Sequence, residues 1–242
     1  NRIELALRCL LVDNGERVVL IETGLGGKID KKFKRMFNVS QTDNPLEDSL
    51  DRNGYSINDI TDVILTHLHF DHSGGALKIN EDGSFSPLFI NATYHISKSN
   101  WELGLHPNPR DKASYLSENY IALKESDQLH LVEDNSMILE DISTISVNGH
   151  TFGQQLIKIS SENDSLVFCS DLIPLRSHLK LPWIMGYDLN AHLTLEEKTV
   201  FLLEASRNNW WLYFYHDPNT IAVQIKQGEK HYDIINEIES IE

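Results

Sequence analysis

The sequence predicts a single α/β domain, and three observations support this prediction. Its 242 residues suit one large domain, and a chain of this length buries roughly 70–75% of its unfolded surface without covalent links. Segments typical of strands outnumber those typical of helices in both halves, and each half ends in a strand–loop–helix or helix–strand unit. No segment rich in glycine, serine or proline separates the halves, so residues 1–242 are expected to form one domain.

Local signals place the elements of the N-terminal half. The Asn14-Gly15 pair between two β-rich runs is a strong hairpin signal, and Gly54 is a typical residue just beyond a helix end. The patterns predict strands at 3–12, 17–22 and 62–66, and helices at 29–37, at 46–53 and near 74–76.

The second half follows from similar signals. Capping boxes at 99–102 and 194–197 indicate helix starts, the second helix running to about Asn208. A third helix is expected at 112–124. The remaining patterns predict strands at 92–96, 129–132, 142–147, 155–160, 165–170, 210–215 and 221–226.

Composition and charge exclude several classes of protein. The chain has 21 Lys+Arg against 36 Asp+Glu, a net charge of −15, whereas nucleic acids and anionic membranes require a basic face. No run of about 18 apolar residues predicts a membrane span, and two cysteines cannot form a disulfide framework. The first four residues are not those of a signal peptide, so a cytoplasmic location is expected.

Eleven histidines are present, and three of them fall within six residues of the segment THLHFDHSGG. In an extended chain His67 and His69 point to the same side and can share one metal ion. Where the strand turns, Asp71 and His72 are directed to a different position nearby. The spacing therefore favours two adjacent metals over one.

Further ligands are expected at the ends of three other predicted strands. His150 follows residues 142–147, Asp171 follows the apolar run 166–169, and His216 follows the aromatic run 211–215. Strand ends are where α/β folds usually build their sites. These segments could therefore converge at one edge of a sheet.

The motifs THLHFDHSGG, GHTFGQQ, SDL and YHDP resemble those of the metallo-β-lactamase-fold hydrolases, from the opening strands to about residue 226. The resemblance implies a four-layer αββα sandwich of two similar halves, with the metal site at one edge. It also implies two ions, with Asp171 bridging them. The first ion would take His67, His69 and His150, and the second Asp71, His72 and His216.

The segments FINATYHISKSNWE, SDLIPLRSHLKLPWIMGYD and WLYFYHDP are similar to the branch that includes quorum-quenching lactonases and organophosphate hydrolases. Two residues depart from the pattern. Glu22 stands where many relatives carry aspartate. Pro174 stands three residues after Asp171, where well-studied acyl-homoserine lactonases place a catalytic tyrosine, so this chain uses another oxyanion donor or another substrate.

The expected activity is hydrolysis of a small, fairly apolar ester or lactone, acyl-homoserine lactones included, by a dinuclear zinc-bound hydroxide. Imidazole and carboxylate ligands suit zinc, although Mn, Fe or Co fit the same geometry. Asp71 is the candidate catalytic residue, orienting the nucleophile or passing its proton onward. The segment 174–188 is expected to line the substrate pocket, with His178, Trp183, Met185 and Tyr187 as contacts.

Other functions remain open at this point. A phosphotriester or phosphodiester hydrolase would use the same metals, and a thioesterase would require a basic glutathione-binding patch, which is not evident. A catalytically silent binding protein would be expected to have lost ligands, yet all seven positions are filled. The expected partner is a small-molecule substrate, neither nucleic acid nor membrane, and the sequence leaves a homodimer open.

Overall fold

The structure, a computed structural model, describes residues 3–240. The described chain divides into two compact units. The N-terminal unit contains residues 9–97 and 101–131, and the C-terminal unit contains residues 3–8, 98–100 and 132–240. Within residues 3–240, no helix combines the length and the apolar character needed to cross a bilayer.

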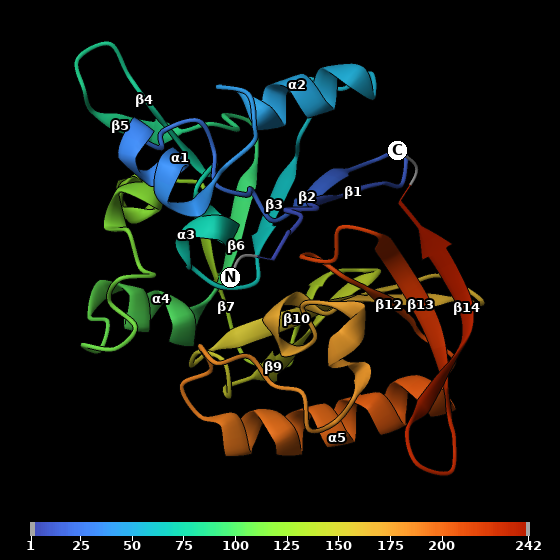
Figure 1. Ribbon diagram of the computed structural model, residues 1–242. Coiled ribbons are helices and arrows are strands. Elements are labelled where there is room, and N and C mark those ends of the chain that lie inside the picture. Colours follow the sequence, from blue (N-terminus) through green and yellow to red (C-terminus); the bar gives the residue numbers. More distant parts are fainter. Residues whose placement is uncertain (1–2, 241–242) are drawn as a thin grey trace. The chain divides into compact units, whose positions relative to one another are not determined.

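The N-terminal unit is built on a five-stranded mixed sheet (Figure 1). Its strands, in spatial order, are β1 (Leu10–Asp13), β2 (Val18–Ile21), β3 (Asp62–Leu65), β6 (Thr93–Ser97) and β7 (Leu129–Val132). The first two form the antiparallel hairpin that Asn14-Gly15 predicts, and Gly15 adopts the positive φ that such turns need. β3 pairs in parallel with both β2 and β6. The short strands β4 (Leu77–Ile79) and β5 (Phe85–Pro87) form a separate hairpin.

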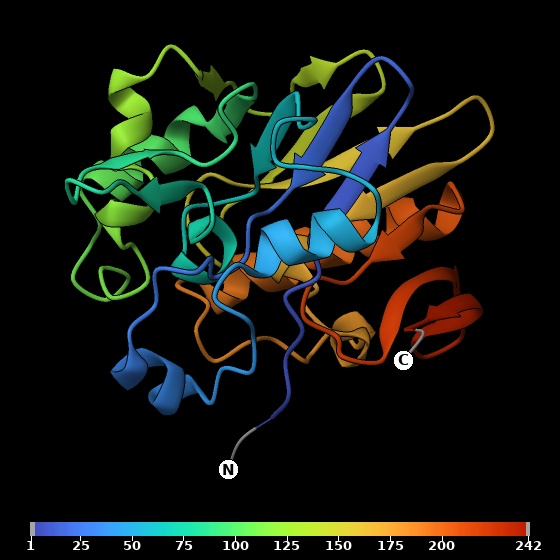
Figure 2. The same cartoon turned by 90° about the horizontal axis from the view of Figure 1, so that it is seen from above.

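Helices of this unit use their apolar residues unequally. Leu46 and Leu50 of α2 (Pro45–Arg52) belong to the same buried core as Val63 of β3. By contrast, α1 (Lys31–Phe37) has no buried residue and lies at the periphery of its unit (Figure 2). The remaining helices are α3 (Phe70–Ser73) and α4 (Lys98–Leu105).

The C-terminal unit is built on a seven-stranded sheet. Its order is β14 (Tyr232–Glu239), β13 (Thr220–Gln227), β12 (Trp211–Tyr213), β11 (Ser165–Phe168), β10 (Gln154–Ser160), β9 (Ile142–Val147) and β8 (Met137–Leu139). Among the described pairs of this sheet, only β11 and β12 run parallel, because the helix α5 (Ala191–Arg207) connects them as a crossover. Phe201 and Leu202 of α5 share a core with Val167 of β11.

Three expectations about elements were wrong in detail. Residues 112–124 form no α-helix: Asn108 Oδ1 accepts hydrogen bonds from the backbone of the next residues, and only 3₁₀ turns at Ser117–Asn119 and Ile121–Glu125 follow. α5 begins before the capping box at 194–197, because Asn190 caps it by accepting from Leu193 N at 3.1 Å. Residues 232–239, where no strand was expected, form the edge strand β14, paired with β13.

Candidate metal centre

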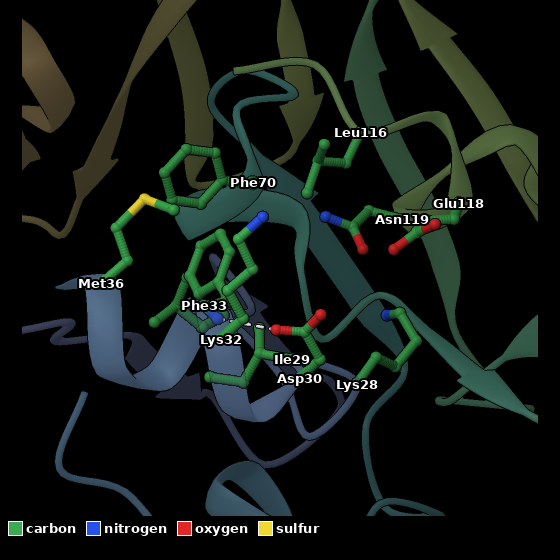
Figure 3. A pocket seen from close by; sticks show the side chains of 11 residues that line it. Lys28, Ile29, Asp30, Lys32, Phe33, Met36, Phe70, Leu116, Glu118 and Asn119 are labelled. Atoms are coloured by element: carbon green, nitrogen blue, oxygen red, sulfur yellow. Dashed lines mark hydrogen bonds between the residues drawn. The ribbon is translucent and has the colours of Figure 1, made fainter. Parts of the chain in front are cut away.

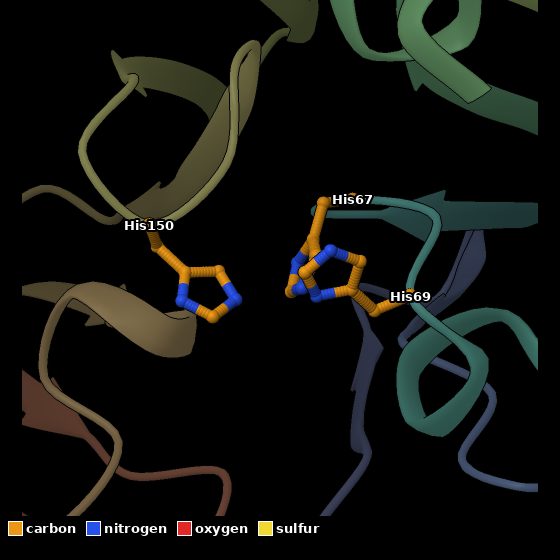
Figure 4. A group of neighbouring side chains, drawn as sticks. All are labelled: His67, His69 and His150. Atoms are coloured by element: carbon orange, nitrogen blue, oxygen red, sulfur yellow. The ribbon is translucent and has the colours of Figure 1, made fainter. Parts of the chain in front are cut away.

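In the N-terminal unit, the segment that leaves β3 brings its histidines together. The ring centroids of His67 and His69 lie 4.5 Å apart, and those of His67 and His72 lie 4.0 Å apart (Figure 4). His69 is the extended N-cap residue of α3, so the chain turns immediately after it. This turn places Asp71 and His72 on the single helical turn of α3, whereas the sequence pattern predicted a helix only near 74–76.

Neighbouring oxygens fix the orientation of these imidazoles. His67 Nδ1 lies 3.0 Å from Thr66 Oγ1, and His69 Nε2 lies 3.1 Å from Asp111 Oδ1. The ring of Tyr115 packs edge-on against His69, with centroids 4.8 Å apart. One nitrogen of each ring faces an oxygen that orients the ring, and Nε2 of His67 and Nδ1 of His69 are the atoms that would bind an ion.

Glu22 is a fully buried carboxylate beside the same cluster. Its Oε1 accepts from Thr66 N at 3.1 Å and lies 3.4 Å from His72 Nδ1. Burial raises the pKa of Glu22, and the neighbouring His72 and Thr66 oppose that rise. Ligand atoms of Glu22, His67 and His72 all lie within 4.8 Å of one another. Glu22 is therefore placed either to bind an ion together with His67 and His72 or to orient the His72 ring.

In the C-terminal unit, Asp171 stands between two histidines. It lies in a 3₁₀ turn (Ser170–Leu172) just beyond β11, and Ser170 before it adopts a positive φ of 45°. Asp171 Oδ2 is 3.2 Å from His150 Nε2, and its Oδ1 is 3.2 Å from His216 Nε2. His150 also appears in Figure 4, on the segment that follows β9. One carboxylate thus presents one oxygen to each of two imidazoles.

The far nitrogens of these two imidazoles are already engaged. His150 Nδ1 lies 2.9 Å from Asp188 Oδ1, and His216 Nδ1 lies 3.0 Å from the backbone oxygen of Ala6. An oxygen of either kind accepts a hydrogen bond, so each Nδ1 carries the hydrogen and each Nε2 carries a lone pair. The two lone pairs then face the Asp171 carboxylate, an arrangement that a cation stabilises. This donor set therefore fits divalent metal ions that bind imidazole and carboxylate.

The seven predicted metal ligands thus form one cluster in each unit. The N-terminal unit contributes His67, His69, Asp71 and His72, and the C-terminal unit contributes His150, Asp171 and His216. Asp71, at 27% exposure of its side chain, is the most accessible ligand-type carboxylate in these clusters, with its Oδ1 3.9 Å from His72 Nε2.

Asp111 and Asp188 are site residues that sequence reasoning missed. Asp111 lies just before residues 112–124, where a helix was expected, and is 42 residues from its partner His69. Asp188 ends the quoted segment SDLIPLRSHLKLPWIMGYD. Its only signal was a single carboxylate closing an apolar run.

The residues predicted for the substrate pocket lie on the loop between β11 and α5. Trp183 and Tyr187 are 49% and 75% exposed, so neither is a core residue, and His178 and Met185 are half-buried. Burial and the nearby Lys198 lower the pKa of His178, which keeps its imidazole neutral at pH 7. The loop therefore exposes aromatic and sulfur side chains, as a binding surface would, and their contact with substrate stays a prediction.

The buried ammonium of Lys198 holds this loop in place. Its Nζ donates to the backbone oxygens of His178 (3.1 Å), Lys180 (3.1 Å) and Trp183 (2.6 Å). Burial lowers the pKa of Lys198 to about 8. A single side chain of α5 thus fixes the backbone that leads to Asp188.

We expect Asp188→Asn to weaken metal binding by about 10–100-fold, as loss of an outer-shell partner usually does. The amide no longer selects the Nδ1–H form of His150 by charge, so the lone pair at Nε2 is less strongly enforced. Competition with a fluorescent chelator measures the affinity. Asp164→Asn, an exposed carboxylate in the β10–β11 turn, serves as the matched control. Equal affinities for the two variants would contradict the role given to Asp188.

A cavity of about 290 Å³ opens beside the histidine segment of the N-terminal unit (Figure 3). Phe70, between His69 and Asp71 in the sequence, packs edge-on against Phe33 of α1, with ring centroids 5.3 Å apart. Phe37 lies 5.6 Å from Phe70. The other lining residues are Leu25, Lys28, Ile29, Asp30, Lys32, Met36, Leu116, Glu118 and Asn119. The cavity therefore combines an aromatic wall with a few polar groups, as small-molecule sites do.

Comparison with known proteins matches this arrangement to one family. The family model described as the metallo-beta-lactamase superfamily matches residues 5–216. An N-acyl homoserine lactonase from Bacillus cereus is 24% identical over 176 residues, which are 69% of this chain. The chain spans about 63% of the length of that curated relative.

Solved structures agree with that match. A probable metal-dependent hydrolase from Staphylococcus aureus is similar with a TM-score of 0.87 at 28% identity, over 98% of this chain and 82% of that one. A dizinc quorum-quenching lactonase, solved with a product, has a TM-score of 0.77 at 24% identity, over 97% of this chain and 80% of that one. These matches confirm the α/β fold class that the motifs predict.

Proposed function

We propose that this chain, which belongs to the metallo-beta-lactamase superfamily, is a hydrolase. It would use two divalent metal ions to cleave a small, fairly apolar ester or lactone. The hydrolase class is common to the family and to the similar proteins described above. We further propose that the centre is dinuclear, that its metal is zinc and that the bond cleaved is an ester.

The observation that carries the proposal is the setting of Asp171. Each of its two oxygens lies 3.2 Å from the Nε2 of an imidazole, His150 or His216. The Nδ1 of each imidazole is held by a different oxygen. A carboxylate with one oxygen for each of two ions is what a bridging ligand requires. We assign His67, His69 and His150 to one ion and Asp71, His72 and His216 to the other, with zinc favoured and Mn, Fe or Co able to replace it.

When bound, such ions supply an attacking hydroxide from water at neutral pH and polarise the substrate oxygen. The chain's own residues orient and move protons. Asp111 and Asp188 hold His69 and His150 in the ligand tautomers. Asp71 is partly exposed, so it can take a proton from the attacking water and return it to the leaving oxygen. Neither a serine nor a cysteine nucleophile is needed.

The substrate class follows from the surroundings of the histidine segment. The cavity wall formed by Phe33 and Phe70 favours an apolar substituent on the substrate. The net charge of −15 disfavours strongly anionic substrates and nucleic acids. We assign substrate contacts on the loop 174–188 to His178, Trp183, Met185 and Tyr187. His178 or Tyr187 would donate to the substrate in place of the tyrosine that Pro174 replaces.

The proposal is tested with a panel of substrates on zinc-loaded protein. Acyl-homoserine lactones of several chain lengths, aryl esters and phosphotriesters are compared by kcat/KM. We expect lactones or aryl esters to be the best substrates, with kcat/KM at least about tenfold above that of any phosphotriester, equivalent to about 1.4 kcal/mol.

Two outcomes of the panel would count against it. Turnover of phosphotriesters with no lactone turnover at any chain length would favour a phosphotriester or phosphodiester hydrolase. Binding of substrates without any turnover, in protein that carries its metals, would indicate a silent binding protein.

A further inference from the structure

A second cluster of titratable side chains lies in the N-terminal unit, at the start of β3 rather than at its end. Asp62, His95 and His130 come from the three neighbouring strands β3, β6 and β7. None of the three belongs to the metal ligands assigned above. The cluster includes a carboxylate, two imidazoles and the guanidinium of Arg17.

Asp62 fixes the tautomer of His95. Its Oδ1 lies 2.8 Å from His95 Nε2. Its Oδ2 accepts hydrogen bonds from Arg17 Nη1 at 2.9 Å and from Thr61 Oγ1 at 2.7 Å. Burial raises the pKa of Asp62, but these hydrogen bonds outweigh it and lower the value to about 2. The ionised carboxylate accepts a hydrogen bond from Nε2–H, so Nδ1 of the buried His95 carries the lone pair.

That lone pair is directed at a second imidazole. His130 Nδ1 lies 3.0 Å from His95 Nδ1, and the two ring planes are nearly perpendicular. His130 is exposed on β7, the edge strand of the sheet. Its ring is therefore accessible to a metal ion from solvent.

The separation of the two nitrogens suits one ion. With metal–nitrogen bonds of about 2.0–2.1 Å, two nitrogens 3.0 Å apart subtend an angle of roughly 95° at the metal. Angles near 90° are typical of the tetragonal geometry of Cu²⁺ and Ni²⁺. The carboxylate behind His95 supplies the outer-shell support that such sites use.

We propose that His95 and His130 form a separate mononuclear site for a divalent transition metal of the Cu²⁺ or Ni²⁺ type, oriented by Asp62 and completed by water. The ion would link the edge strand β7 to β6. The site is independent of the hydrolytic centre, and its failure would leave the proposed function intact.

One equivalent of Cu²⁺ added to the zinc-loaded protein tests the site by electron paramagnetic resonance. Wild type is expected to show Cu²⁺ coupled to two imidazole nitrogens and a higher Tm than without copper. His130→Ala is expected to lose both. Because His130 is exposed, this variant should keep its fold and hydrolytic activity.

His231→Ala is the matched control, since His231 is also an exposed imidazole near a carboxylate, 3.4 Å from Asp233. This control should behave as wild type does. Asp62→Asn should weaken copper binding by about 10–100-fold. An unchanged copper signal in His130→Ala would overturn the proposal, because the copper would then lie elsewhere. So would a wild type that retains no copper after gel filtration, which would leave only a proton shared between the two imidazoles.

Discussion

Asp171→Asn is expected to reduce hydrolysis by more than the ~100-fold that loss of an outer-shell partner costs. The amide keeps one oxygen acceptor but replaces the second with an NH₂ donor, which repels a cation. One of the two imidazoles, His150 or His216, therefore loses the carboxylate oxygen that it shares with an ion. Metal content should fall from two equivalents to one or fewer. Atomic emission on the purified variant, together with kcat/KM on its best substrate, measures both effects.

The control for this prediction is Asp141→Asn, which alters an exposed carboxylate of the same unit. It should keep the metal content and rate of the wild type. Circular dichroism distinguishes loss of metal from loss of fold. If Asp171→Asn retained two ions and a rate within tenfold of wild type, Asp171 would not be a bridging ligand.

Gly74→Ala is expected to destabilise the fold by about 3 kcal/mol, the upper part of the range for overpacked interiors. A Cβ at Gly74 would lie 2.6 Å from Phe70 O and closer still to Leu25 O. Both obstacles are backbone, so neither can rotate away. Lys28 Nζ also donates to the backbone oxygen of Gly74, which holds the segment against its neighbour. The turn that carries Asp71 and His72 would have to shift.

Urea unfolding measures this cost. Gly186→Ala is the matched substitution, since nothing lies within 4 Å of its Cβ position and its φ is not positive. That control should change the free energy of unfolding by no more than about 0.5 kcal/mol. A Gly74→Ala protein as stable as Gly186→Ala would show that the close approach to Leu25 does not constrain the turn.

The local parts of the structure could be predicted from the sequence. The strand that leads to His67 and the turn at Asp71 depend on neighbouring residues, so pattern and motif place them. The hairpin at Asn14-Gly15 and the helix end at Gly54 are local in the same way. The fold class followed because such elements alternate in both halves.

The long-range parts could not be predicted in this way. Asp111 and Asp188 act through partners 42 and 38 residues away, and no spacing rule links them to His69 or His150. The backbone oxygen of Ala6 supports His216 across 210 residues without any side-chain signal. Residues 112–124 have a helical composition but form no α-helix. The chain just before them is held in a turn by the Asn108 side chain and by the hydrogen bond between Asp111 and His69.

Metal content tests the central claim most directly. We would measure it by inductively coupled plasma mass spectrometry on His130→Ala protein, loaded with zinc and then gel-filtered, so that the separate two-histidine site does not contribute. The account predicts two tightly held ions per chain, and hydrolysis that disappears on chelation and returns with zinc. A chain that holds one ion or none, yet hydrolyses its substrate at the full rate, would contradict it.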